Sequence, residues 1–112
     1  LTLVIAINYG SHNEILDATR QIINDVNGGK LMVENISAEV FEKYLHTNGI
    51  PNPDLIIRTS GEQRLSNFLL WQAAYSELVF MDILWPDFTK KSLEKAIGEF
   101  ERRERRYGGT AG

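Results

Sequence analysis

The sequence predicts an α/β fold in which a layered, mainly parallel sheet is flanked by helices. Two observations lead to this prediction. Short apolar runs typical of buried strands alternate with stretches whose apolar residues recur at helical spacing. The opening run, residues 1–7, is apolar apart from Thr2, as is typical of a parallel strand covered on both faces. Because such a strand has neighbours on either side, we expect further strands to lie upstream, in a longer polypeptide.

A helix is expected directly after this run. Ser11 and Glu14 have the spacing of a capping box, and apolar residues then recur on one helical face up to the glycine pair at 28–29. A shorter helix is expected to begin at a Ser37 cap and to end near Asn48, before two prolines that mark a connection. The first half of the chain therefore predicts one strand and two helices.

The second half of the chain again alternates predicted strands and predicted helices. It predicts a strand at 55–57 that ends at Arg58, a short buried helix at 68–75, a strand at 78–81 and a final helix over 89–106. Ligands of parallel α/β sheets collect at the carboxyl ends of the strands. The polar loops that follow the three predicted strands are therefore the candidate functional segments.

Composition narrows the classes of function. The formal net charge is −3 and the isoelectric point is about 5.3. Both values argue against a broad basic surface for nucleic acid or anionic membranes, so any anion site must be local. The absence of cysteine excludes disulfides and thiolate metal sites and is compatible with the cytoplasm. No apolar run is long enough to cross a bilayer.

The loop at 58–67 is the densest polar segment. It combines Arg58 and Arg64 with three hydroxyl side chains and Gly61, directly after an apolar strand. Arginine forks match phosphate oxygens, and a glycine lets main-chain N–H groups approach an anion closely. Ser66 is also placed to cap the predicted helix that follows, whose positive end would favour the same anion. One interpretation is therefore a diphosphate cradle.

A second interpretation of the same loop stays open. Glu62 could pair with an arginine of the loop while the hydroxyls satisfy turn backbone, which would leave a plain solvated surface. Glu77, at the start of an apolar run, is either an exposed strand-end acid or a carboxylate paired with arginine or metal. His12 and His46 are interpreted as surface residues near helix ends. The turn at 8–10 could contact a ligand or act simply as a helix start.

Several motifs together resemble one family. The segment 54–72, which reads DLIIRTSGEQRLSNFLLWQ, is followed by Glu77-Leu78, by LWPDF at 84–88 and by RRYGG at 105–109. These motifs, in this order and spacing, closely resemble cis-prenyltransferases, and most of all bacterial undecaprenyl diphosphate synthase, also called isoprenyl transferase. The resemblance covers nearly the whole chain. It implies that residues 1–112 are the C-terminal portion of a single cis-prenyltransferase domain.

The resemblance also implies roles for individual residues. Arg58, Arg64 and Ser66 would hold the diphosphate of isopentenyl diphosphate, and Glu77 would help to place Mg²⁺. Arg106 and Gly108 resemble the terminal Arg-x-Gly element, which in the family reaches toward the active site across a homodimer interface. Gln63 stands where some members carry histidine, so the resemblance leaves a proton-handling role at this position open.

The implied reaction adds isopentenyl diphosphate to an allylic diphosphate, such as farnesyl diphosphate, and creates cis double bonds. The product would be a polyprenyl diphosphate that serves as a precursor of a carrier lipid, which implies a cytoplasmic enzyme with peripheral membrane contact through its product. The aspartate loop of the family has no counterpart in this chain and is expected upstream. The chain alone is therefore expected to have little or no turnover.

Two other classes remain as alternatives. One is a non-catalytic partner subunit of a heteromeric cis-prenyltransferase, although retention of the full ionic set speaks against it. The other is an unrelated nucleotide-binding module, which the lack of both glycine-rich phosphate-binding signatures places last.

Overall fold

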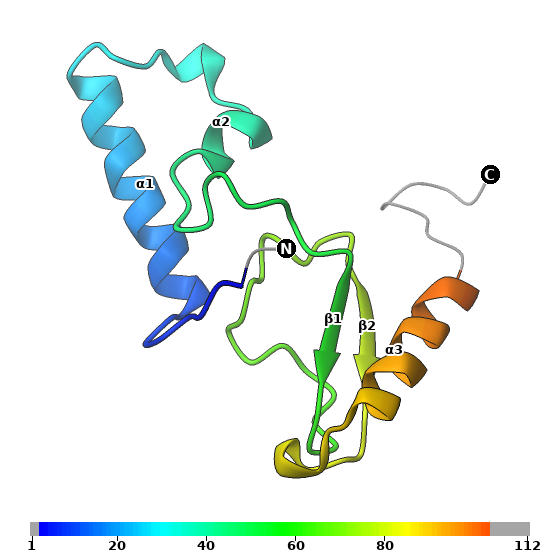
Figure 1. Ribbon diagram of the computed structural model, residues 1–112. Helices are drawn as coiled ribbons and strands as arrows, with labels where there is room; N and C mark the ends of the chain where they lie inside the picture. Colours follow the sequence, from blue (N-terminus) through cyan, green and yellow to red (C-terminus); the bar gives the residue numbers. More distant parts are fainter. Residues whose placement is uncertain (1–2, 104–112) are drawn as a thin grey trace. The chain divides into compact units, whose positions relative to one another are not determined.

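The computed structural model describes residues 3–103 (Figure 1). The chain divides into two compact units, Leu1–Pro51 and Asn52–Gly112. The helices and strands are α1 (Ser11–Asn27), a 3₁₀ turn (Val33–Asn35), α2 (Ala38–Glu42), β1 (Leu55–Arg58), β2 (Glu77–Phe80), a second 3₁₀ turn (Trp85–Asp87) and α3 (Lys90–Arg102). The predicted α/β class with a parallel sheet and helices is confirmed. Within residues 3–103, none of the helices is long and apolar enough to cross a membrane.

Helix α1 forms where the sequence predicts it, but its start differs. Ala18 and Ile22 are buried on one face, and the Gly28 N–H donates to the Asn24 carbonyl oxygen at 2.9 Å as the helix ends. The predicted capping box is wrong, because Gly10 occupies the cap position and no side chain caps the helix. Glu14 is instead fully buried and bonded to other segments, so tertiary contacts replace the local cap.

Helix α2 is shorter than the sequence predicts. The Ser37 cap is confirmed, since its hydroxyl accepts a hydrogen bond from the Val40 N–H at 3.1 Å. The helix ends at Glu42, and the chain then forms turns and bends. Leu45 is buried within these turns, so the apolar residues of this stretch pack without a continuous helix.

The opening apolar run is not a strand in the described residues. Residues 3–7 form no ladder, and Leu3 and Ile7 are 83% and 80% exposed. A strand exists only when a neighbour supplies hydrogen-bond partners for its main chain. Among the described residues no such neighbour pairs with this run, so the prediction of a covered strand fails here.

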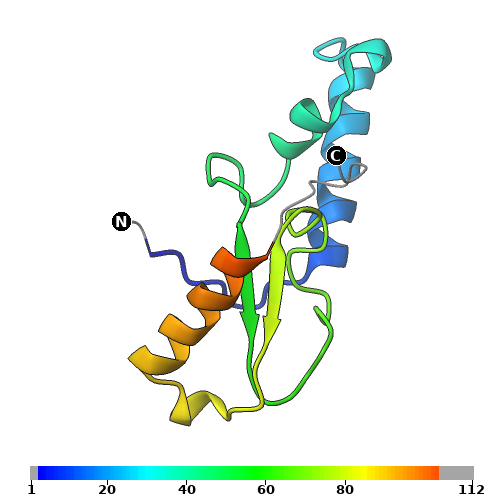
Figure 2. The ribbon, with the colours of Figure 1, turned by 90° about the vertical axis from the view of Figure 1, so that its right-hand side faces the viewer.

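The second unit is built on two parallel strands. β1 and β2 pair in the register Leu55 to Glu77 and Arg58 to Phe80. Helix α3 contacts β2 and lies beside it in Figure 1, and Figure 2 shows the helix on the near side of the two strands. The core consists of one sheet face and the inner side of α3, with these buried or partly buried members: Val79, Met81, Ala96, Leu55, Ile57, Ile83 and Phe88. Because side chains alternate along a strand, this face carries the odd-numbered residues.

The predicted helix at 68–75 is wrong. This segment forms bends and turns, in which the Ala73 N–H donates to the Leu69 carbonyl oxygen at 2.8 Å. Asn67 and Leu69 have φ angles of 63° and 49°. Residues in the left-handed region cannot continue a right-handed helix. Local backbone geometry therefore overrides the helical spacing of the apolar residues.

Helix α3 begins with a reciprocal cap. The Thr89 hydroxyl accepts from the Ser92 N–H, and the Ser92 hydroxyl accepts from the Thr89 N–H at 3.2 Å. The helix ends at Arg102. The sequence predicts helix as far as Arg106, and the part of that prediction beyond residue 103 lies outside the described residues.

Candidate functional site

The loop after β1 is held against the segment after β2. The Met81 N–H donates to the Arg58 carbonyl oxygen at 2.8 Å, the Ser60 N–H to Ile83 at 2.6 Å and the Gly61 N–H to Met81 at 3.1 Å. Main-chain hydrogen bonds between the two segments therefore continue beyond the two strands. This corrects one prediction, because the N–H groups of Ser60 and Gly61 are already bonded and cannot cradle an anion.

The two arginines of the loop are brought together. Arg58 Nη1 donates to the Arg64 carbonyl oxygen at 2.8 Å, which closes the loop from the end of β1. Arg64 Nη2 lies 3.2 Å from Glu62 Oε2, and the Arg64 side chain is 73% exposed. Such an exposed pair contributes about 0–1 kcal/mol. The pairing expected for a solvated loop thus forms, yet it is weak enough for a phosphate to replace it.

Ser66 lies in the same loop but does not cap a helix. Its φ is 50°, its side chain is exposed, and turns rather than a helix follow it. The predicted helix dipole is therefore absent from this part of the described chain. Ser66 can still offer its hydroxyl as a neutral donor.

Gly61 and Asp82 both line a small cavity at the carboxyl edge of the sheet. The cavity measures about 250 Å³ and is lined by Gly61, Gln63, Phe80, Met81 and Asp82. Gly61 has φ of 71°, and a Cβ there would lie 3.1 Å from Asp82 Oδ1. Sequence reasoning pointed to the turn after Met81 but missed Asp82. The sequence signal for Asp82 was an acidic residue directly after an apolar strand.

Glu77 lies far from the arginine loop. It pairs with Leu55 at the amino end of the sheet, whereas Arg58 pairs with Phe80 at the carboxyl end. Three residues of strand separate the two positions, which is about 10 Å at a rise of roughly 3.3 Å per residue. Glu77 also belongs to the face that α3 covers, and Arg58 belongs to the other face. The described chain therefore does not bring these two site residues together.

The Glu77 carboxylate has a charged neighbour instead. Arg103 Nη1 lies 3.6 Å from Glu77 Oε2, and the Glu77 side chain is 20% exposed. The same nitrogen donates a hydrogen bond to the Leu78 carbonyl oxygen. Sequence reasoning anticipated an arginine partner for Glu77 but did not identify Arg103.

A magnesium site would receive a single carboxylate from this part of the chain. In the described range 3–103, no three acidic or histidine side chains gather in a way that could hold a metal ion. Mg²⁺ commonly takes one or two carboxylates and completes its shell with water and substrate phosphate. Glu77 is a carboxylate of the type that such a shell uses.

The first unit contains a buried carboxylate under the turn at 8–10. Glu14 accepts hydrogen bonds from the Tyr9 hydroxyl at 2.5 Å and from the His46 N–H at 2.9 Å. The Glu14 N–H also donates to the Gly10 carbonyl oxygen at 3.0 Å. Glu14 thereby joins the turn, α1 and the segment after α2. Sequence reasoning assigned Glu14 only a capping role, because nothing local reveals these distant donors.

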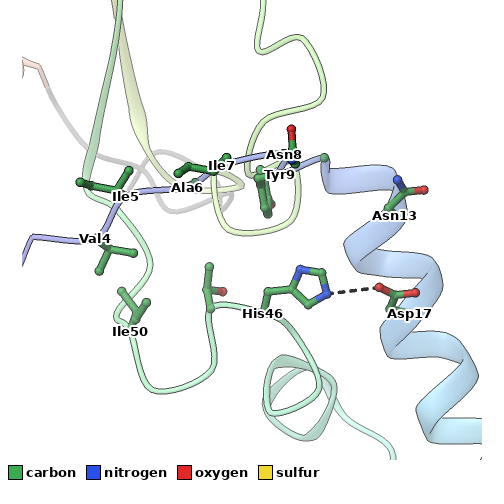
Figure 3. Close-up of a pocket in the computed structure, with 12 residues that line it drawn as sticks. Val4, Ile5, Ala6, Ile7, Asn8, Tyr9, Asn13, Asp17, His46 and Ile50 are labelled. Atoms are coloured by element: carbon green, nitrogen blue, oxygen red, sulfur yellow. Dashed lines mark ion pairs between the residues drawn. The ribbon is translucent and has the colours of Figure 1, made fainter.

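A cavity of about 530 Å³ is lined in part by Tyr9 and His46, the two partners of this carboxylate. Figure 3 shows apolar Val4, Ile5 and Ile50 at one side of it and the His46 imidazole directed at Asp17 at the other. His46 Nε2 lies 3.3 Å from Asp17 Oδ2. His46 is exposed, as the sequence predicts, but it contacts α1 rather than a helix end.

Two further predicted site residues, Arg106 and Gly108, lie outside the described residues.

Comparison with known proteins identifies the family. Residues 1–108 match the family model of undecaprenyl diphosphate synthases. The chain belongs to this prenyltransferase family. The resemblance stated from the sequence motifs is confirmed, and the family is one of enzymes that transfer prenyl groups.

Individual prenyltransferases of the family agree with this assignment. Isoprenyl transferase 2 of Bradyrhizobium diazoefficiens is 61% identical over 109 residues, which cover 97% of this chain and 43% of that protein. Isoprenyl transferase of Thermotoga maritima is 57% identical over 109 residues, covering 97% and 46%. The chain thus spans less than half the length of these relatives.

A solved structure agrees with the fold. Lavandulyl diphosphate synthase from Lavandula x intermedia, crystallised in complex with dimethylallyl diphosphate, has a TM-score of 0.88 and 41% sequence identity to this chain. The match covers 92% of this chain and 44% of that one.

Proposed function

We propose that this chain provides the isopentenyl diphosphate side of a cis-prenyltransferase site. The supporting observation is the bond from Arg58 Nη1 to the Arg64 carbonyl oxygen, which holds two guanidinium groups in one loop at the carboxyl edge of β1. Arginine forks bind phosphate oxygens in a bidentate way. The similar lavandulyl synthase was solved with an allylic diphosphate, which supports a second diphosphate as co-substrate.

The proposed reaction is the addition of isopentenyl diphosphate to an allylic diphosphate with a cis double bond, toward a polyprenyl diphosphate. The leaving diphosphate gains negative charge as its carbon–oxygen bond breaks. Fixed positive groups stabilise that charge, and a positioned alkene replaces a random encounter with an aligned one. In this chain, Arg58 and Arg64 would hold the isopentenyl diphosphate, and Ser66 would donate a neutral hydrogen bond to it.

The proposal includes three further parts. Glu77 would provide one ligand to Mg²⁺, which when bound neutralises diphosphate charge. A homodimer would form, to which Arg106 and Gly108 contribute. The remaining metal ligand, an aspartate, would come from a part of the protein that this sequence does not contain. For this reason we propose that the 112-residue chain has little or no turnover by itself.

Calorimetric titration of the chain with isopentenyl diphosphate tests the central claim. The variants are Arg58→Ala and Arg64→Ala, and Arg102→Ala is the matched control because it loses the same charge from an exposed position on α3. We expect each loop variant to bind about tenfold or more weakly, the value of a charged hydrogen bond of roughly 1.5–3 kcal/mol. Unchanged binding in the loop variants, or no binding by the original chain, would contradict the proposal.

A further inference from the structure

One side chain, that of Arg103, links the end of helix α3 to the start of strand β2. At Arg103 the main chain leaves the helix, with φ of −84° and ψ of 138°, and its N–H donates to the Phe100 carbonyl oxygen at 3.2 Å. The Arg103 guanidinium reaches across the sheet edge and bonds to the Leu78 carbonyl oxygen. The same group lies 3.6 Å from the Glu77 carboxylate. A main-chain acceptor thus fixes the cation beside the acid.

The acid is the less exposed partner of this ion pair. Glu77 has a side chain that is 20% exposed and Arg103 one that is 39% exposed, so both are partly removed from water. A partly buried carboxylate is costly without a counter-charge. Within residues 3–103, Arg103 is the one cation that lies within 4.0 Å of the Glu77 carboxylate. Arg103 therefore neutralises Glu77 when no other cation is present.

We propose that Arg103 is a positioning residue and internal counter-ion for Glu77, which a divalent cation must displace in order to bind. The inference rests on the proposed role of Glu77 as a metal ligand. A guanidinium and a divalent cation repel each other when they share one carboxylate. The pair would therefore hold Glu77 in place without metal and weaken the intrinsic affinity of the site for the cation.

The test is titration of the chain with Mn²⁺ as a probe for Mg²⁺, followed by electron paramagnetic resonance. Arg103→Gln removes the charge, and Arg103→Lys retains it. We expect Arg103→Gln to bind Mn²⁺ roughly two- to fivefold more tightly than the original chain, which corresponds to a pair of about 0.5–1 kcal/mol. Arg103→Lys is expected to bind as the original chain does.

Three controls make the outcome specific. Arg102→Gln loses the same charge one residue earlier, where the side chain pairs with Glu99 and not with Glu77, and should leave the affinity unchanged. Glu77→Gln should abolish the binding that Arg103→Gln strengthens. Arg103→Met gives a second neutral variant of similar length if Arg103→Gln does not fold, as judged by circular dichroism.

Equal Mn²⁺ affinity in the original chain and both neutral variants would overturn the inference, as would binding by none of them. A tighter Arg102→Gln variant would overturn it too, because general electrostatics would then explain the effect. The titration with isopentenyl diphosphate tests the proposed function separately. That binding depends on Arg58 and Arg64, at the other end of the sheet.

Discussion

Arg58 and Arg64 are joined by a hydrogen bond from the side chain of the first to the main chain of the second, at 2.8 Å. The bond spans six residues and closes the loop that follows β1. Arg58 consequently has two tasks, since it carries charge and also fixes the position of Arg64. The Arg64 guanidinium pairs with the nearby Glu62 and contributes its charge to the loop.

Conservative substitutions separate these two tasks. Lysine keeps the charge of arginine but lacks its planar fork of donors. We expect Arg58→Lys to weaken isopentenyl diphosphate binding about tenfold, through loss of one charge-assisted hydrogen bond worth roughly 1.5 kcal/mol and of the loop closure it provides. Arg64→Lys should weaken binding less. Calorimetry on both variants makes the comparison, and equal losses would argue against a closing role for Arg58.

The buried Glu14 carboxylate should matter for stability. Glu14→Ala leaves the Tyr9 hydroxyl and the His46 N–H without the acceptor that both use. We expect the free energy of unfolding to fall by about 2–3 kcal/mol, and by about 1 kcal/mol in Tyr9→Phe, where one hydrogen bond is lost. Urea unfolding provides the measurement. The exposed Glu34 serves as control, and a Glu14→Ala variant as stable as Glu34→Ala would refute the prediction.

The backbone angle at position 61 favours glycine over other residues. Its φ is 71°, and Gly29 has a similar φ of 76° but open space within 4 Å of the position that a Cβ would take. We expect alanine at either position to cost roughly 1–2 kcal/mol. The two costs should agree, because Asp82 is exposed and its carboxylate can rotate away. Thermal unfolding of both variants checks this. If Asp82→Ala rescues Gly61→Ala, the contact rather than the angle is decisive.

Alkaline pH should weaken the contact between Tyr44 and α1. The Tyr44 hydroxyl donates to Asp25 Oδ2 at 2.6 Å. This hydrogen bond, followed by desolvation and the Asp25 charge, raises the pKa of Tyr44 above its ordinary value. The unfolded chain therefore loses this proton first as the pH rises, so the stability from the contact is complete below about pH 10 and is lost through the raised pKa.

Urea unfolding of the original chain and Tyr44→Phe, from about pH 8 to pH 11, tests this sign. The difference in unfolding free energy should be constant up to about pH 10 and then shrink. A difference that stays constant over the whole range would show that the hydrogen bond does not favour the protonated hydroxyl.

Strands β1 and β2 were predictable from sequence because short apolar runs between turn residues have few alternatives to a buried strand. The start of β2 is Glu77 rather than Leu78, a shift of one residue. The Ser37 cap and most of α1 and α3 were also predictable, since their signals lie within a few residues of each other. The family motifs were sufficient to single out the arginine loop.

Features that depend on distant partners were not predictable. The helix proposed for 68–75 fails because Leu69 adopts a left-handed φ, which its residue type does not announce. Glu14 was assigned a local cap, while its partners include the main chain of His46, 32 positions further along. The separation of Glu77 from Arg58 follows from strand register, which motif spacing does not encode.

The main-chain bonds from Ser60 to Ile83 and from Gly61 to Met81 fix the start of the arginine loop against the segment that follows β2. Two residues of the loop are already fixed to the neighbouring segment, so capture of an anion there costs less chain entropy than it would in an unattached loop. Because Arg58, Arg64 and Ser66 would bind an anion through their side chains, single substitutions there can retune affinity without removing these main-chain bonds. Encounter with a diphosphate should then be governed by ionic strength rather than by slow reshaping of the backbone.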